Sequence, residues 1–157
     1  MQVRRVTGDD RSWIAEVVRG SFASTRVVSR GRVSDTAELD GFAVENDGRP
    51  IGCALWREED GDAELVVLVT TYRGAGAGTA LLDAVVDYAR EQGWKRLWLI
   101  TTNDNTDAMR LYQRAGWNWV AFHRDAVDNA RALKPELPPE GAHGIPIRHE
   151  IEFEYPL

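Results

Sequence analysis

The sequence predicts an α/β fold of the α+β type, built on a mixed, mostly antiparallel sheet of six to seven strands. Apolar segments at residues 39–45, 51–57 and 64–69 are joined by short polar turns containing Asp and Gly, a pattern typical of antiparallel hairpins. A long helical pattern and another apolar strand at 96–101 follow, and this strand–helix–strand order adds one parallel crossover. Three antiparallel strands ahead of the crossover disfavour a doubly wound fold.

The N-terminal part is expected to form a strand, a helix and a loop. Residues 1–6 alternate between polar and apolar side chains, which predicts a short strand, and residues 8–10 supply a turn. Apolar residues at helical spacing from Trp13 onward predict a helix that ends at about Ser21. Residues 24–33 contain three arginines without a clear period, and we interpret them as a solvated loop.

The part behind the crossover is expected to add two helices and two strands. In order these are a helix at 105–115, a strand at 117–122, a short helix at 125–133, an irregular segment at 134–141 whose three prolines break regular structure, and a last strand at 149–155. Asn105 suits the N-cap of the first of these helices and Gly116 suits its stop. The last strand alternates strictly, so we expect its apolar residues to face the core and its glutamates to face solvent: Ile151, Phe153 and Tyr155 inward, and Glu150, Glu152 and Glu154 outward.

Length and charge limit the classes of protein. At 157 residues the chain is expected to form one domain, residues 1–157, with its own hydrophobic core. A formal net charge of −6 disfavours nucleic acid as a partner and makes a cationic amine an electrostatically easier partner. Cys53 is the only cysteine and lies in an apolar strand, so we expect a buried thiol in a reducing compartment.

Two further kinds of feature are not expected. No window approaches the roughly eighteen apolar residues of a membrane-spanning helix, and residues 1–10 contain no apolar leader segment. We therefore expect no membrane partner and a cytoplasmic location. His123, His143 and His149 are too scattered in the sequence to predict a metal site.

The segment ELVVLVTTYRGAGAG, from Glu64 to Gly78, joins a strand through a glycine turn to a helix. Such a junction presents backbone N–H groups at a helix N-terminus, where an anion binds, and glycine allows its close approach. A Walker loop would need a lysine that is missing here, and a dinucleotide fingerprint would need Gly-x-Gly-x-x-Gly at the start of a βαβ unit. The pattern present is Arg-x-x-Gly-x-Gly, at Arg73, Gly76 and Gly78. We interpret it as a pyrophosphate-binding loop, with a tight turn that holds no ligand as the alternative.

A second motif, NTDAMRLYQRAGW, runs from Asn105 to Trp117. It has the form Asn-x-x-Ala-x-x-x-Tyr and is closed by Gly-aromatic. The two motifs together, in this order, resemble the coenzyme A loop and the corresponding helix of the GNAT superfamily of acyl-CoA N-acyltransferases. The resemblance spans roughly residues 40–122.

This resemblance implies a GNAT-like sheet with helices on both faces and a splay between the two central parallel strands, in which the pantetheine arm lies. It implies acetyl-CoA as cosubstrate without a metal. The residues implied in cofactor binding are the backbone of two strand residues, the glycine loop with the start of its helix, and the N-cap asparagine: Leu68, Val69, Arg73, Gly74, Ala75, Gly76, Ala77, Gly78, Thr79 and Asn105.

The resemblance also implies two catalytic side chains. Tyr112 matches the tyrosine that protonates the departing thiolate, although it shares a helical face with Leu111 and would also suit the core. Glu64 is an acidic residue entering an apolar strand, where burial would raise its pKa toward that of a useful general base. An edge carboxylate beside the polar turn is the alternative for Glu64, and a water relay would remove the need for a base.

The function expected is N-acetyl transfer from acetyl-CoA to a primary amine of a small molecule or peptide, by direct attack without an acyl-enzyme. A catalytically inactive coenzyme A-binding regulatory or interaction module is the alternative, and a dinucleotide-binding oxidoreductase is disfavoured by the hairpins. The sequence does not identify the acceptor, and it leaves a homodimer open. The segment 135–148 is expected to border the acceptor mouth, and residues 24–33 would form a flap over it if they were not simply a solvated loop. Trp117 and Trp119 are interpreted as core residues.

Overall fold

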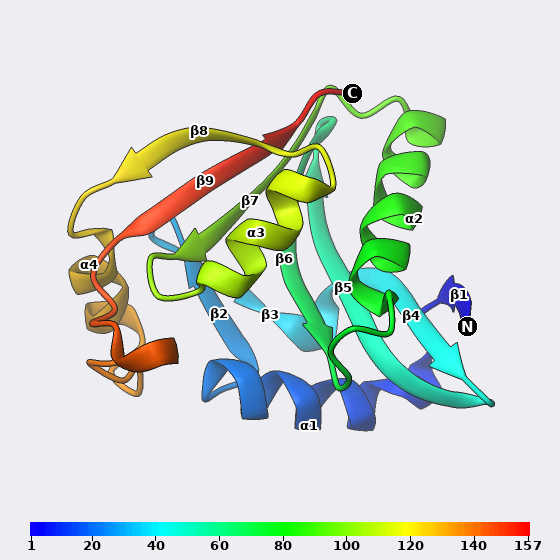
Figure 1. Ribbon diagram of the computed structural model, residues 1–157, viewed down its shortest axis with the longest axis horizontal. Helices are drawn as coiled ribbons and strands as arrows, with labels where there is room; N and C mark the ends of the chain where they lie inside the picture. Colours follow the sequence, from blue (N-terminus) through cyan, green and yellow to red (C-terminus); the bar gives the residue numbers. More distant parts are fainter.

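Seven strands form one sheet in the order β1-β4-β5-β6-β7-β9-β8, and the computed structural model describes all residues, 1–157 (Figure 1). β6 and β7 run parallel, and the other neighbouring pairs are antiparallel. The strands are β1 (Gln2–Arg5), β4 (Asp40–Asn46), β5 (Arg49–Glu59), β6 (Asp62–Thr70), β7 (Arg96–Thr102), β8 (Asn118–His123) and β9 (Glu150–Tyr155). A separate hairpin consists of β2 (Arg26–Ser29) and β3 (Arg32–Asp35), and the helices are α1 (Arg11–Phe22), α2 (Ala77–Gln92), α3 (Thr106–Arg114) and α4 (Ala126–Leu133). The predicted mixed, mostly antiparallel sheet is confirmed.

Three hairpins turn through two residues that both have positive φ. These angles are 52° and 75° at Asp47-Gly48, 54° and 84° at Asp60-Gly61, and 48° and 73° at Arg30-Gly31. Turns of this kind match the twist of the flanking strands, and glycine adopts positive φ without steric cost. The third turn shows that the solvated loop expected at 24–33 was wrong, because this segment forms β2 and the start of β3.

Helices cover both faces of the sheet, as expected. On one face α2 and α3 pack Leu82 and Tyr112 into a core that includes Phe153 of β9. On the other face α1 packs Ile14 into a second core that includes Val67 of β6. Figure 1 shows α3 in front of the sheet and the hairpin β2–β3 behind it.

A β-bulge at Val66 divides β6 into two halves. Trp56 pairs with Leu65 while Leu55 pairs with Val67, so that Val66 is one residue more than β5 can match. Before the bulge Leu65 packs into the core under α2 and α3, whereas after it Val67 packs into the core under α1. In a regular strand Leu65 and Val67 would face the same layer, and the extra residue between them places them in opposite layers.

The two parallel strands separate soon after they meet. β6 and β7 are paired at Asp62↔Arg96, at the next residue of each strand, and finally at Glu64↔Trp98. β6 then continues to Thr70 without a partner on its β7 side, because β7 is bonded beyond this point to β9 alone. The splay implied by the family resemblance is therefore present, with its vertex at Glu64 and Trp98.

The glutamates of β9 do not form the solvated face that was expected. Glu150 is buried beneath the hairpin and accepts a bond from the Arg30 guanidinium at 3.2 Å. Glu152 accepts a bond from Arg96 Nη2 at 2.5 Å and lies 2.9 Å from His123 Nε2. Alternation predicted correctly which residues share this face, but it could not predict that the hairpin covers part of it.

Two other expectations about the core had different outcomes. Trp117 is buried, whereas Trp119 is 51% exposed because it lies on β8, an edge strand with a single neighbour. Cys53 is fully buried, and burial raises the pKa of its thiol to about 12, so the thiol remains protonated. No helix of the protein combines the length and apolar character needed to cross a bilayer.

Candidate active site

The loop between β6 and α2 ends in backbone amides that have no partner in the protein. The first helical bond of α2 is from Ala80 N–H to Gly76 O, and no backbone or side-chain acceptor contacts the N–H groups of residues 74–79. The N-cap, Gly76, has φ of 80° and offers no side chain. These amides lie at the positive end of the helix dipole, and the protein leaves them free to donate to an anion.

Glycine is required at two positions of this loop for different reasons. Gly76 needs its positive φ to turn the chain into the helix. Gly78 lies inside the first turn, where an added Cβ would come within 3.0 Å of Leu111 Cδ2. A side chain here would crowd α2 against α3, so this glycine sets the close approach of the two helices that flank the gap.

Arg73 contacts a protein carboxylate from its exposed position in the loop. Its Nη1 lies 2.7 Å from Asp107 Oδ2 in the first turn of α3, and His143 Nε2 lies 3.3 Å from the same oxygen. The Arg73 guanidinium is the larger cause, and His143 the smaller, of an Asp107 pKa below its usual range. This exposed pair joins the loop after β6 to the helix after β7, on either side of the splay.

Between these helix ends, β6 presents an unpaired backbone edge. Thr71 N–H donates to Ile51 O of β5. The N–H and C=O groups of successive strand residues point to opposite sides, so those of Val69, two residues earlier, also face β5. The N–H and C=O of Leu68 then face the gap. Of the two residues predicted to bind pantetheine through their backbone, Leu68 is the one whose polar groups are directed toward the splay.

Tyr112 combines a core ring with an available hydroxyl. Its ring packs on Trp117 and Phe153, at centroid distances of 6.2 and 5.6 Å. The hydroxyl has no hydrogen-bond partner in the protein. Its oxygen is not fully buried, because the only fully buried side-chain nitrogen or oxygen without a partner is Trp117 Nε1. Burial raises the Tyr112 pKa, which keeps its proton on the oxygen.

Asn105 occupies the N-cap of α3, as predicted, but its side chain does not cap the helix. Its Nδ2 instead donates to Thr101 Oγ1 of β7 at 3.2 Å. The neighbouring Asp104 accepts a bond from Ala142 N–H at 3.0 Å, which fastens the segment 135–148 to the end of β7. This segment therefore lies beside the start of α3.

Glu64 lies at the vertex of the splay, on the face of the sheet that the β2–β3 hairpin covers. It is 2% exposed, accepts a bond from the Ser29 hydroxyl of β2, and is paired with Arg57 Nη2 at 2.7 Å. Burial is the largest cause of a raised Glu64 pKa, which Ser29 and Arg57 only partly oppose. A buried carboxyl with a raised pKa has the character of a general base.

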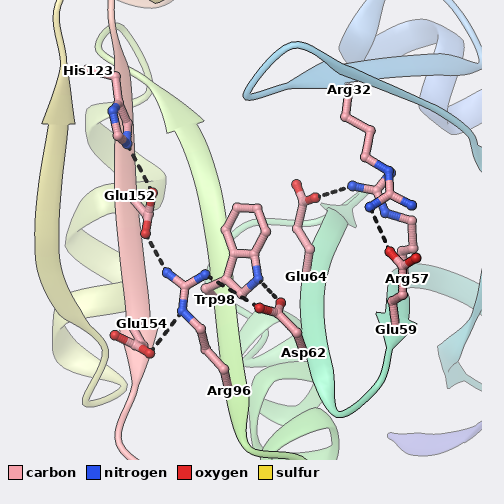
Figure 2. A network of polar contacts seen from close by, with 10 residues as sticks. All are labelled: Arg32, Arg57, Glu59, Asp62, Glu64, Arg96, Trp98, His123, Glu152 and Glu154. Atoms are coloured by element: carbon pink, nitrogen blue, oxygen red, sulfur yellow. Dashed lines mark hydrogen bonds and ion pairs between the residues drawn. The ribbon is translucent and has the colours of Figure 1, made fainter.

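A cavity of about 300 Å³ adjoins Glu64 (Figure 2). It is lined by charged residues of β3, β5 and β6 and by one indole of β7: Arg32, Arg57, Glu59, Asp62, Glu64 and Trp98. Sequence analysis singled out only Glu64 among these. Strand alternation could have predicted some of the others. Asp62 lies on the same face of β6 as Glu64, and the cross-strand neighbours of Glu64 are Arg57 on β5 and Trp98 on β7. No group of three or more His, Cys, Asp or Glu side chains is arranged to hold a metal ion.

Comparison with known proteins identifies the family. A model of the acetyltransferase (GNAT) family matches residues 12–117. YdhI of Bacillus subtilis is 44% identical over 117 residues, which cover 74% of this chain and 73% of YdhI. An amino-acid acetyltransferase of Yersinia enterocolitica is 34% identical over 106 residues, covering 64% of this chain but 24% of that protein.

The fold comparison agrees with this result. A GNAT family acetyltransferase from Elizabethkingia anophelis, solved with acetyl-CoA bound, superposes with a TM-score of 0.79 at 17% identity over 99% of this chain and 97% of its own. The protein belongs to the acetyltransferase (GNAT) family.

Proposed function

We propose that this protein is an N-acetyltransferase that moves an acetyl group from acetyl-CoA to a primary amine by direct attack. The observation that carries the proposal is the combination of unpartnered amides at the start of α2 with an unpaired β6 edge beside a gap. The first suits a diphosphate and the second suits an amide-containing arm that pairs like an added strand. Acetyl-CoA carries both groups and, when bound, supplies the acetyl group as a thioester.

In this proposal the chain holds the donor mainly through its backbone. Amides of residues 74–79 bind the diphosphate, and Leu68 pairs with the pantetheine arm. Arg73 can add charge if it exchanges Asp107 for phosphate. Asn105 borders the arm through its side chain. The Leu68 N–H directed into the gap also suits stabilisation of the negative charge that develops on the thioester oxygen.

Two side chains move protons at the vertex and along the gap. Glu64 accepts, directly or through a water, the proton that the attacking nitrogen must lose. Tyr112 gives its hydroxyl proton to the departing sulfur. The new C–N bond replaces the broken C–S bond, Glu64 releases its proton to solvent and solvent returns one to Tyr112, so no oxidant or further reactant is needed.

A coenzyme A-binding regulatory module is the second candidate, and one observation favours it. Glu64 is already bonded to Arg57 and Ser29, and an arginine partner stabilises the carboxylate and lowers its basicity. Thiol release from acetyl-CoA, measured across a panel of primary amines, separates the two candidates. Release with at least one amine supports the enzyme, whereas tight coenzyme A binding without release supports the module.

The role of Glu64 is tested by Glu64→Gln, with Glu91→Gln on the exposed side of α2 as the matched control. Because burial raises the Glu64 pKa, its carboxyl group loses its proton at a higher pH than an exposed glutamate does. The kcat at saturating amine should therefore rise with pH through that higher range in the wild type and in the control. Loss of this rise in Glu64→Gln, with kcat lowered about a hundredfold or more, supports the base. An unchanged pH profile would assign the proton to a water relay.

A further inference from the structure

The cavity beside Glu64 contains one carboxylate whose charge the protein does not neutralise. Glu64 is paired with Arg57 at 2.7 Å, and Glu59 with Arg32 at 3.1 Å. Asp62, in contrast, accepts a bond from the neutral Trp98 indole N–H, at 2.5 Å. When Glu64 is ionised, as a general base must be, three carboxylates face two arginines around this cavity, and the excess negative charge lies on Asp62.

The nearest additional cation does not compensate Asp62. Arg96 Nη1 lies 3.9 Å from the Asp62 carboxylate, whereas Arg96 makes closer contacts with Glu152 at 2.5 Å and Glu154 at 3.1 Å. Figure 2 shows this single guanidinium between carboxylates of β6 and β9. Its charge is thus shared among three acidic groups, which leaves this part of the sheet face negative.

Asp62 also has the geometry of an anchor. The indole N–H holds its carboxylate in one orientation, while the side chain remains 55% exposed at the cavity. Asp62 and Glu64 lie two residues apart on the same face of β6, a separation of roughly 7 Å along the strand. A flexible aliphatic chain with a nitrogen at each end spans this distance.

We infer that the cavity binds the acceptor, and that the acceptor is an aliphatic amine carrying a second positive charge, which Asp62 binds while the reacting nitrogen lies near Glu64. This inference rests on the proposed function for the reacting nitrogen. Glu64 and Trp98, the last β6–β7 pair before the strands separate, both line the cavity, so an acceptor bound there lies beside the gap. An acceptor with an anionic second group would face the uncompensated carboxylate.

Three acceptors that share one chain length test the inference. Cadaverine ends in a second ammonium, pentylamine in a methyl group and aminovalerate in a carboxylate. After correction for its two equivalent amines, cadaverine should show a kcat/KM about tenfold above that of pentylamine, with aminovalerate lowest. Salt should reduce this preference, because Asp62 is exposed.

The variant Asp62→Asn, with Asp83→Asn on the outer face of α2 as the control, assigns the preference to one residue. Asp62→Asn should raise KM for cadaverine about tenfold, leave kcat nearly unchanged, and leave pentylamine unaffected. Equal use of cadaverine and pentylamine, preference for aminovalerate, or an unchanged cadaverine KM in Asp62→Asn would each overturn the inference.

Calorimetric titration of the coenzyme A complex with the same three compounds supplies a readout that does not need turnover. Tighter binding of cadaverine, weakened in Asp62→Asn, supports the cation site even if no thiol is released, in which case the transferase proposal alone fails. Thiol release without any preference for cadaverine has the opposite meaning, since it supports the transferase and rejects the cation site.

Discussion

Replacement of Tyr112 by Phe isolates one hydroxyl group. The ring packs on Trp117 and Phe153, and phenylalanine preserves both contacts. The hydroxyl has no partner in the protein, so its removal strands no donor or acceptor and should change the free energy of unfolding by less than about 1 kcal/mol. Loss of a general acid lowers turnover by about 10² to 10⁴, equivalent to about 3–5 kcal/mol of transition-state stabilisation.

The assay compares three quantities for Tyr112→Phe and the wild type. These are kcat from thiol release, the Kd of coenzyme A from calorimetry, and the free energy of unfolding from urea denaturation. Tyr155→Phe is the matched control, because it removes a hydroxyl from a tyrosine on β9 that also packs on Trp117. We expect a large loss in kcat for Tyr112→Phe only, with Kd within about threefold of the wild type. Equal losses in kcat and coenzyme A affinity would reduce Tyr112 to a packing residue.

Three further predictions concern the loop, its arginine and the N-terminal region. Gly76→Ala forces a side chain into positive φ, so it should destabilise the protein by about 1 kcal/mol and also weaken coenzyme A binding, whereas Gly93→Ala at the other end of α2 should destabilise it similarly without affecting binding. Asp107→Asn releases Arg73 and should strengthen coenzyme A binding about twofold to fivefold by calorimetry, but only while Arg73 is present. The pKa of Asp10 lies at about 2, below its usual 3.8, chiefly through a hydrogen bond from its arginine partner on β1, so Asp10→Asn should lower the free energy of unfolding by about 2 kcal/mol at neutral pH.

Each of these predictions has an outcome that contradicts it. Equal effects of Gly76→Ala and Gly93→Ala on coenzyme A affinity would remove the loop from the binding site. A gain in affinity from Asp107→Asn that persists in an Arg73→Gln background would exclude exchange of the arginine. The stabilisation from Asp10 is complete above pH 3.8 and is lost as pH falls toward 2, so a difference between variant and wild type that stays constant down to pH 2 would refute its ionic origin.

Local signals in the sequence predicted most of the sheet. Asp-Gly turns between apolar runs predicted β4, β5 and β6, because a two-residue turn fixes the pairing of its strands. The hairpin β2–β3 was missed, although its turn at Arg30-Gly31 belongs to the same class. Its strands are four residues each and contain Arg26 and Arg32, which pair with Glu136 and Glu59 elsewhere in the chain, so no apolar alternation marked them.

The part of the candidate site that consists of backbone groups could be predicted from the sequence. A glycine loop before a helix exposes amides wherever it occurs, so the unpartnered amides at residues 74–79 followed from sequence order. The surroundings of Glu64 could not be predicted in this way. Ser29 lies 35 positions away in the sequence, and it reaches Glu64 only because the hairpin folds over the sheet. Trp119 shows the same limit, since its exposure depends on β8 being the last strand of the sheet.

The bulge at Val66 gives β6 one residue more than its pairing with β5 requires. Leu65 and Val67 face opposite layers, as consecutive residues of a regular strand do, so removal of Val66 would close the bulge and keep both side chains in their own layers. Other insertions and deletions within β6 would shift the pairing with β5, so in homologous chains we expect them in the turns on either side of this strand. An alignment that opens a gap of one residue at Val66 would, on this basis, identify a relative whose strand has no bulge.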